Sequence, residues 1–283
     1  MITYPNVKLN LGLRVLRKRP DGYHDIDTLF LPCDRYHDTL EIIRGDDWSR
    51  TSAALFSRYV RPGQLVQGIS SDGRLMITLA GKDGIGWDPL KDLTARAHAL
   101  LSADFDLPPM KIFLEKGSPV GAGLGGGSAD AAFALRMMAD LAGLPLSDAD
   151  LLAYAARLGS DCAFFVYNRP MFGSGRGEIL SDAPEGILPS DRYRVEVTVP
   201  EGISVSTAEA YAGIVPGVPA ESVREIVAKS PEQWKGLLVN DFEQTVFAIH
   251  PSLAAIKENF YNQGAIYASM SGSGSAVFGI FPL

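Results

Sequence analysis

The sequence of 283 residues has only two cysteines, Cys33 and Cys162. Two cysteines are too few for a disulfide framework or a cysteine-based zinc site, so we expect reduced thiols and a cytoplasmic location. The chain also lacks any apolar run near the roughly 18 residues that a membrane span requires. A strand pattern begins by residue 6, so we expect no targeting peptide ahead of it. These absences predict a protein without a membrane partner.

Positive charge is scarce as well. The chain has 26 lysines and arginines against 33 aspartates and glutamates, which gives a formal net charge of −7. A surface that binds nucleic acid is normally basic, so this balance argues against a nucleic-acid partner. A small anionic ligand is still compatible, because only the local field inside a cleft matters. With 46% hydrophobic and 21% charged residues, the composition is typical of a globular protein.

The first predicted element is a strand over residues 6–15. Apolar and polar side chains alternate along it, so Lys8, Asn10 and Arg14 share one face. The opposite, apolar face is formed by Val7, Leu9, Leu11, Leu13 and Val15. This pattern predicts a half-buried strand that presents Lys8 and Asn10 side by side.

Strands and helices are mixed in both halves of the chain. Further strands are predicted over 39–44, 74–80, 111–115, 193–200 and 275–281. Helices are predicted over 93–101, 128–143, 148–158, 220–229, 231–239 and 250–259. Ser147 is expected to cap the helix over 148–158, with Asp150 completing a capping box. The predicted fold class is therefore α+β with two lobes.

The segment PVGAGLGGGSADAA, residues 119–132, has five glycines in nine positions before a predicted helix. Unneeded glycine costs roughly 0.5–1 kcal/mol relative to alanine, so the segment is expected to use its bare backbone. Inward amides followed by a helix that opens at Ser128 favour a bound anion. A helix end supplies only about 0.3–1 kcal/mol, so converging amides, a metal ion and a distant lysine are also needed. The alternative is a flexible turn that allows tight helix packing.

Two nucleotide-binding motifs fit this segment poorly. Gly121, Gly123 and Gly126 match G-x-G-x-x-G, but another helix follows where a dinucleotide-binding unit needs a second strand. A nicotinamide-dependent oxidoreductase is therefore a weaker alternative. The Walker pattern fails because Gly127 stands where its lysine belongs.

The segment instead resembles the ATP loop of the GHMP kinases, small-molecule kinases that include galactokinase, homoserine kinase and mevalonate kinase. SMSGSGSAVFGIF, residues 269–281, resembles the second glycine-rich motif of that family. The resemblance implies a two-lobed GHMP-kinase fold with the active site in the cleft between the lobes. Residues 1–165 would form the N-terminal ATP-binding domain and residues 166–283 the C-terminal domain. It also implies ATP as the phosphoryl donor, with Mg²⁺ arriving with the nucleotide and no metal cage in the protein.

Two further segments narrow the resemblance. PNVKLNLGLRVLRKRPDGYHDIDTLF, residues 5–30, and LGSDCAFFV, residues 158–166, are similar to one branch of the family. That branch phosphorylates the 2-hydroxyl of a cytidine-diphosphate-linked sugar alcohol in non-mevalonate isoprenoid precursor synthesis. The expected partner is this small molecule, and the expected assembly is a monomer or a weak homodimer. The alternatives are a kinase for mevalonate or homoserine and an inactive nucleotide-binding protein.

The resemblance also implies the catalytic residues. Asp161 is the candidate base for the proton of the acceptor hydroxyl, and Lys8 is the candidate cation that orients Asp161 and offsets the transferred charge. Without the resemblance, Asp161 would be a turn residue and Lys8 an exposed strand lysine. Asn10 is expected to hydrogen-bond the acceptor. Cys162 and Ala163 depart from the Val-Pro that often follows the motif aspartate.

The binding residues are carried over in the same way. Those for ATP are Lys116, near the adenine, and the loop of Pro119, Val120, Gly121, Ala122, Gly123, Leu124, Gly125, Gly126, Gly127, Ser128 and Ala129. Ser128 is expected to lie closest to phosphate or Mg²⁺. Those for the substrate are Asn10, Tyr23, His24, Thr207, Tyr211, Ser271, Gly272, Ser273 and Gly274.

Each substrate-binding residue has an expected task. Tyr23 and Tyr211 would be aromatic walls around the cytosine, and His24 would read the edge of the base. Thr207 would lie near the sugar, while residues 271–274 would support the substrate's phosphates. The alternatives are ordinary core packing for Tyr211 and a turn role for His24.

Overall fold

A computed structural model describes all residues from Met1 to Leu283, and the chain forms two compact units. Unit 1 comprises Met1–Val7, Tyr36–Val120 and Gly126–Asn168, and unit 2 comprises Lys8–Arg35, Gly121–Gly125 and Arg169–Leu283. This division differs from the predicted single boundary after residue 165. Strand pairing is the reason, because β3 (His24–His37) pairs with β8 (Met171–Ser174) and so ties N-terminal residues to the later half of the chain.

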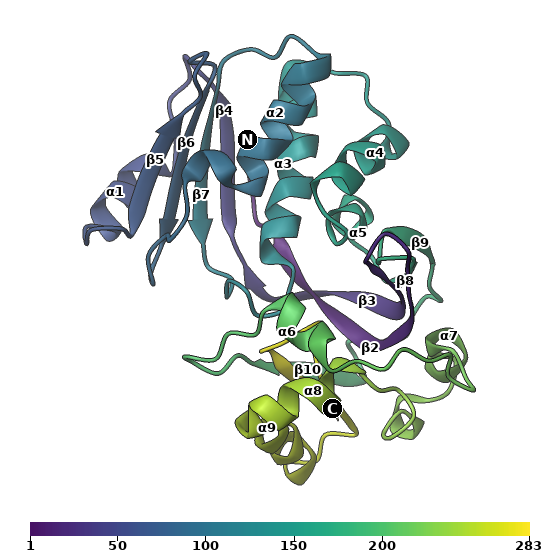
Figure 1. The fold of residues 1–283 in the computed structure, drawn as a ribbon. Helices are drawn as coiled ribbons and strands as arrows, with labels where there is room; N and C mark the ends of the chain where they lie inside the picture. Colours follow the sequence, from purple (N-terminus) through teal and green to yellow (C-terminus); the bar gives the residue numbers. More distant parts are fainter. The chain divides into compact units, whose positions relative to one another are not determined.

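Unit 1 is built on a five-stranded sheet in the order β1-β4-β7-β6-β5. Strands β6 and β7 are parallel, and the other neighbours are antiparallel. The strands are β1 (Ile2–Thr3), β4 (Thr39–Arg44), β5 (Leu65–Ile69), β6 (Leu75–Gly81) and β7 (Met110–Lys116). The helices are α1 (Ser52–Arg58), η1 (Pro89–Lys91), α2 (Leu93–Asp104), α3 (Gly126–Ala142), α4 (Asp148–Leu158) and α5 (Cys162–Tyr167). Figure 1 shows α2 and α3 side by side along the sheet.

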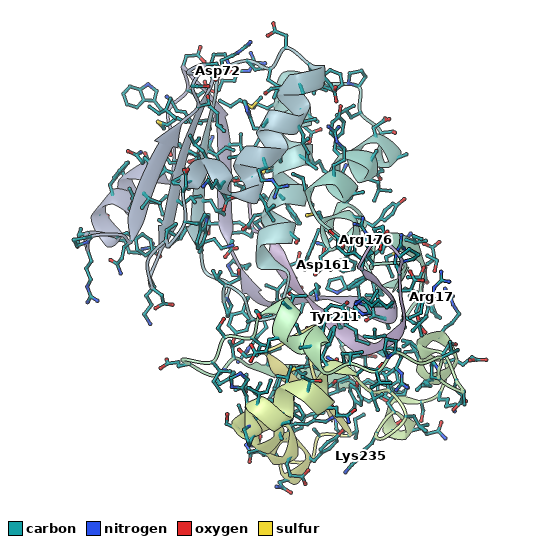
Figure 2. The ribbon with its side chains drawn as sticks, in the orientation of Figure 1. Arg17, Asp72, Asp161, Arg176, Tyr211 and Lys235 are labelled. Atoms are coloured by element: carbon teal, nitrogen blue, oxygen red, sulfur yellow. The ribbon has the colours of Figure 1, made fainter.

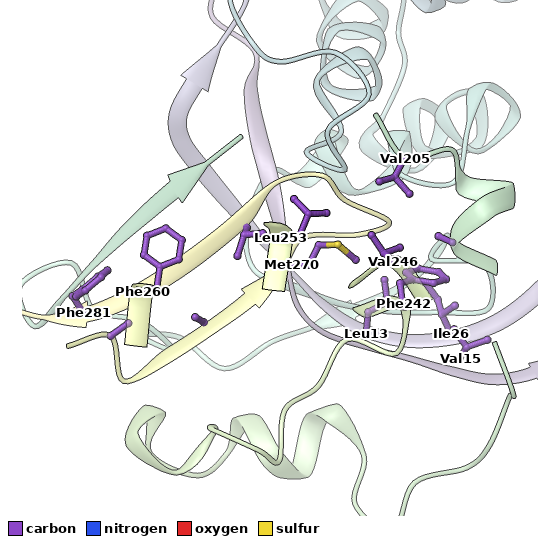
Figure 3. Close-up of a cluster of buried hydrophobic side chains, with 14 residues drawn as sticks. Leu13, Val15, Ile26, Val205, Phe242, Val246, Leu253, Phe260, Met270 and Phe281 are labelled. Carbon is purple, nitrogen blue, oxygen red and sulfur yellow. The ribbon is translucent and has the colours of Figure 1, made fainter. Parts of the chain in front are cut away.

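Unit 2 contains two sheets, ordered β2-β3-β8-β9 and β10-β12-β11. Its remaining strands are β2 (Asn6–Lys18), β9 (Ile179–Asp182), β10 (Tyr193–Thr198), β11 (Tyr267–Met270) and β12 (Val277–Pro282). Its helices are α6 (Thr207–Ala212), α7 (Val223–Val227), η2 (Pro231–Gln233), α8 (Phe242–Ile249) and α9 (Pro251–Asn262). The apolar core in Figure 3 joins β2 to α8, α9 and β11, with Leu13, Phe242, Leu253 and Met270 among its members.

The strongest local patterns are confirmed. Strand β4 has the predicted bounds, and Ser147 and Asp150 form the predicted capping box at the start of α4. Helix α3 ends at Ala142 because Gly143 adopts a φ of 66°, which favours glycine. The helices α3, α4 and α5 follow one another after the glycine loop, so the second strand of a dinucleotide-binding unit is absent. None of the helices is both long and apolar enough to cross a membrane.

Two expectations are wrong. Strand β2 is not half-buried, because both of its faces are covered from Asn6 to Leu13, and Lys8 and Asn10 are only 3% and 2% exposed. The helix predicted over 231–239 shrinks to the three residues of η2. There Gly236 adopts a φ of 79°, and the indole of the buried Trp234 donates to the carbonyl of Lys229, which holds the segment as a turn.

Candidate active site

The first glycine segment has a backbone that only glycine adopts easily. Gly121, Gly123 and Gly125 have φ of 72°, 76° and 73°, all in the left-handed region. None of the chain's hydrogen bonds uses the N–H groups of Gly123, Leu124 or Gly125. A Cβ on Gly123 would lie 2.2 Å from the carbonyl oxygen of Ser271. The segment therefore offers unpaired backbone donors, and it leaves no space for a side chain at residue 123.

Lys8 on β2 reaches this segment with both its backbone and its ammonium. Its backbone N–H donates to the carbonyl of Leu124 (2.9 Å), and its Nζ donates to the carbonyl of Gly123 (3.0 Å). The ammonium also donates to Oδ1 of Asn10 and lies 5.6 Å from the centre of the Phe30 ring. A buried cation needs such acceptors, since leaving water without them is costly. Lys8 is therefore not the exposed strand lysine that it would be without the family resemblance.

Asn10 orients this lysine. Its Nδ2 donates to Oγ1 of Thr28 (3.1 Å), whose hydroxyl donates to the carbonyl of Gly12 (2.5 Å). That contact fixes which end of the amide faces Lys8. The side chain of Asn10 therefore has partners within the protein at both ends of its amide.

The second glycine segment, residues 271–274, lies against the same groups. The Ser271 hydroxyl donates to the carbonyl of Gly123 (3.1 Å) and accepts from the backbone N–H of Asn10 (3.3 Å). A Cβ on Gly272 would lie 3.4 Å from Nζ of Lys8 and 3.1 Å from the oxygen of Gly123. The structure thus brings Lys8, Asn10, Gly123, Ser271 and Gly272 together within unit 2. An ammonium beside unpaired amides is suited to bind an anion.

The predicted base lies in unit 1, and Figure 2 marks it just before α5. Asp161 occupies the N-cap position of α5, after Gly159 has ended α4. Its neighbour Cys162 is buried and is hydrogen-bonded by Ser128 of α3, and burial raises the pKa of this thiol to about 11. Cys162 is therefore a packing residue, and it contributes no thiolate near pH 7.

Lys116, expected near the adenine, lies in a buried ion cluster of unit 1. Its Nζ contacts Asp38 Oδ2 and lies 2.5 Å from Asp130 Oδ2, and the three side chains are at most 7% exposed. Burial opposes the charge of Lys116, but Asp130 and Asp38 outweigh it and raise the pKa of the ammonium. Burial also raises the pKa of Asp130 well above its usual range, against the effect of Lys116.

Asp38 extends this cluster to the start of the glycine loop. Its Oδ1 accepts from the backbone N–H groups of Gly117 and Ser118, both at 2.7 Å, and its Oδ2 accepts from the Ser118 hydroxyl at 2.9 Å. Sequence reasoning missed this residue, because its partners lie 78 to 80 positions away. Asp38 fixes the chain directly ahead of Pro119.

The residues expected at the cytosine divide into two contacts within unit 2. The rings of His24 and Tyr211 stack at 4.5 Å with an angle of 15°, and Tyr211 packs edge-on against Phe242. Tyr23 is 55% exposed, and the guanidinium of Arg176 lies 4.9 Å from its ring centre. Thr207 is the first residue of α6, on the exposed side. The stack rules out a purely local turn role for His24.

The site offers donors rather than metal ligands. Burial, and then the charge of Lys18, lower the pKa of His24, so its imidazole is neutral near pH 7. A neutral imidazole has one donor and one acceptor nitrogen. Across the chain, no group of three or more His, Cys, Asp or Glu side chains is arranged to hold a metal ion.

The ion cluster of unit 1 gives a stability prediction. Lys116→Met leaves Asp38 and Asp130 buried without their cation, and removing one partner of a buried pair costs about 3–5 kcal/mol. We expect that loss in the free energy of unfolding, measured by urea denaturation at pH 7. Lys111→Met on the same strand is the control, because Lys111 contacts only the carbonyl of Asp47 and should change stability by less than about 0.5 kcal/mol. Unchanged stability in Lys116→Met, with only a higher KM for ATP, would make Lys116 a nucleotide ligand instead.

Comparisons with known proteins show the family of this chain. The family models "GHMP kinases N terminal domain" and "GHMP kinases C terminal" match residues 92–169 and 220–283. The 4-diphosphocytidyl-2-C-methyl-D-erythritol kinase of Bacteroides thetaiotaomicron is 43% identical over 281 residues, which cover 99% of this chain and 92% of that protein. The enzyme of the same name from Bacteroides fragilis is 41% identical, with the same two coverages.

Solved structures give the same result. The crystal structure of a 4-(cytidine 5'-diphospho)-2C-methyl-D-erythritol kinase matches with a TM-score of 0.69 at 30% identity, and the match covers 99% of this chain and 89% of that one. A mevalonate kinase, with a TM-score of 0.63 at 14% identity over 99% and 91% of the two chains, is similar in fold alone. The chain therefore belongs to the GHMP kinases and, within them, to the family of 4-diphosphocytidyl-2-C-methyl-D-erythritol kinases.

Proposed function

We propose that this kinase transfers the γ-phosphoryl group of ATP to the 2-hydroxyl of 4-diphosphocytidyl-2-C-methyl-D-erythritol, a step of the non-mevalonate isoprenoid pathway. The observation that carries the proposal is the ammonium of Lys8, held against the carbonyl of Gly123 at 3.0 Å beside unpaired backbone donors. Family membership over the whole chain supplies the choice of substrate.

On the donor side, the phosphates of ATP would bind to the backbone N–H groups of Gly123, Leu124 and Gly125. The chain leads from these directly into α3, a helix of 17 residues whose first N–H groups also favour negative charge. No three His, Cys, Asp or Glu side chains are grouped to hold a metal ion, so a metal would be held mainly by the nucleotide's own phosphates. Mg²⁺ bound in this way neutralises phosphate charge, and Ser128 is the residue that would help to hold it.

The transfer itself is an exchange of two bonds at phosphorus. The 2-hydroxyl oxygen bonds to the γ-phosphorus, the bond from that phosphorus to the oxygen of the β-phosphate breaks, and ADP leaves. Asp161 takes the hydroxyl proton, and Lys8 offsets the negative charge on the transferring group. Since such transfers need little covalent chemistry from the protein, placement and charge supply most of the rate.

On the acceptor side, Tyr23 and Tyr211 would provide faces for the cytosine, and His24 would hydrogen-bond its edge. The neutral His24 suits this task because it can donate and accept at once. Thr207 would contact the sugar, and residues 271–274 would support the substrate's phosphates. Asn10 would act mainly through Lys8, given the partners that its amide already has.

The first experiment is an assay of ADP release with different acceptors. With ATP and Mg²⁺, we expect turnover on 4-diphosphocytidyl-2-C-methyl-D-erythritol and none above background on mevalonate or homoserine. Chelating Mg²⁺ should abolish the turnover. Faster turnover on mevalonate or homoserine would assign the chain to another kinase activity.

The second prediction concerns the proposed catalytic pair. Lys8→Ala and Asp161→Asn should each lower kcat by about 10²- to 10⁴-fold, the range for loss of a positioned acid–base or charged group. Lys82→Ala and Asp83→Asn remove the same charges from an exposed turn after β6 and should keep normal turnover. Circular dichroism checks that each variant is folded. Near-normal turnover of either site variant would remove that residue from the mechanism.

The third prediction separates recognition of the base from packing. Stacking on an aromatic ring is worth about 1–3 kcal/mol for each base, so Tyr211→Ala should raise KM for the cytidylyl substrate by about tenfold or more, with little change in KM for ATP. Tyr211→Phe keeps the ring and should behave like the wild type. Equal increases in both KM values would mean that Tyr211 serves the core around Phe242.

A further inference from the structure

Asn240, between Val239 and α8, binds the backbone of the second glycine segment. Its Nδ2 donates to the carbonyl oxygens of Met270 and Gly272, both at 2.8 Å, and its Oδ1 accepts from the backbone N–H of Phe242 at 3.0 Å. The residue is 2% exposed. Because a buried amide with three partners has a fixed orientation, these contacts fix both carbonyl groups as well.

Glu243, one turn later, holds the residues just ahead of that segment. Its Oε1 accepts from the backbone N–H of Met270 (2.8 Å) and the hydroxyl of Ser269 (3.1 Å). Its Oε2 accepts from Lys257 of α9 (2.6 Å), which satisfies the carboxylate. Asn240 and Glu243 thus bind both backbone groups of Met270, whose side chain belongs to the same apolar core as Phe242 (Figure 3).

The segment that these two residues hold is the one that contacts Lys8. The Ser271 hydroxyl donates to the carbonyl of Gly123, and the N–H of Ala276 donates to the carbonyl of Ala122 (3.0 Å). Gly272 has a φ of 55° and lies against Lys8 Nζ and Gly123. A shift of the carbonyl of Gly272 would therefore move both the ammonium and the first glycine segment.

The second glycine segment also has backbone N–H groups that are available to a ligand. None of the chain's hydrogen bonds uses the N–H groups of Gly272 or Ser273, whereas the N–H of Gly274 closes a turn onto the carbonyl of Ser271 (3.0 Å). With the carbonyls of Met270 and Gly272 bound on one side by Asn240, the peptide planes that carry these free N–H groups are restrained too. The same side chain therefore sets the geometry of backbone donors in the second glycine segment.

We propose that Asn240 is a positioning residue for phosphoryl transfer, acting through residues 270–272 on Lys8 and on the carbonyl of Gly123. This inference rests on the proposed function for the reaction that the kinetic test measures. The contacts of Asn240 themselves do not depend on which substrate the enzyme uses. This role also explains why residue 240 is asparagine. Among side chains as short as this one, only the uncharged amide can donate two hydrogen bonds from a single nitrogen. A carboxylate at residue 240 would face two carbonyl oxygens and repel them.

The test compares Asn240→Asp with wild type by kinetics. We expect kcat to fall about tenfold to 100-fold, as misplacement of a reacting group by about 1 Å can cost 10²-fold, with KM for both substrates changed less than threefold. Asn240→Ser keeps one donor, adds no charge and should lose less. Asn262→Asp at the exposed end of α9 adds the same charge elsewhere and should keep normal turnover.

A stability control separates positioning from general loss of structure. Val227→Ala removes buried methyl groups from α7 of the same unit and should lower the melting temperature while leaving kcat unchanged at 25 °C. If Asn240→Asp is folded at that temperature and keeps its kcat, or if Val227→Ala loses kcat to the same extent, the positioning role is wrong.

Amide hydrogen exchange gives a readout without any reaction. In Asn240→Asp, the hydrogen-bonded amides of Lys8, Ser271, Gly274 and Ala276, which tie the two glycine segments together, should exchange faster than in wild type, while those of β4 and β7 should be unchanged. Wild-type protein that fails to turn over the cytidylyl substrate would overturn the proposed function and leave this exchange result as the test of the positioning role. Unchanged exchange of these four hydrogen-bonded amides would overturn the positioning role itself.

Discussion

The hydrogen bond from the ammonium of Lys8 to the carbonyl of Gly123 is the contact on which the rest of unit 2 depends. It joins the first long strand to a segment 115 residues later and places a cation on a residue that is 3% exposed. An unsatisfied charge at that depth would cost several kcal/mol, so the acceptors have to be held in place. Residue 123 has to be glycine for the two glycine segments to lie this close together, since a Cβ there would collide with the backbone of Ser271.

Both glycine segments obtain their rigidity from polar side chains outside them. Glycine loses more conformational freedom on folding than any other residue, so a run of glycines does not hold a shape by itself. In unit 1, Asp38 binds the N–H groups of Gly117 and Ser118 ahead of the first segment. In unit 2, Asn240 binds two carbonyl oxygens at the start of the second. An anionic carboxylate restrains donors and a neutral amide restrains acceptors, as the chemistry of each partner requires.

The sequence predicted those features whose signals are local. The capping box of Ser147 and Asp150 spans four residues, and β4 is a short β-branched run, so both could be identified without knowledge of the fold. The burial of Lys8 and Asn10 could not be identified in this way, because an alternating strand has the same sequence pattern whether its polar face lies against water or against another segment. Strand β3 was missed for a related reason, since its charged residues hide a strand that pairs with β8 far along the chain. Asp38 and Asn240 act on residues about 30 to 80 positions away, and no local pattern marks such contacts.

The stack between His24 and Tyr211 changes how the proposed acceptor would gain its binding energy. These rings are already in contact at 4.5 Å, so a cytosine that stacks on the same face of Tyr211 has to replace the imidazole. The lost imidazole contact, about 0.5–1.5 kcal/mol, then offsets part of the about 1–3 kcal/mol that the base gains by stacking on Tyr211. Discrimination between bases would therefore come from hydrogen bonds to the base edge. A wrong base would leave buried polar groups of the site unpaired, and this penalty is larger than any difference in stacking between bases. The neutral imidazole of His24, once displaced from Tyr211 by the base, is suited to supply those hydrogen bonds. Recognition of the base would therefore be coupled to the opening of the stack between His24 and Tyr211.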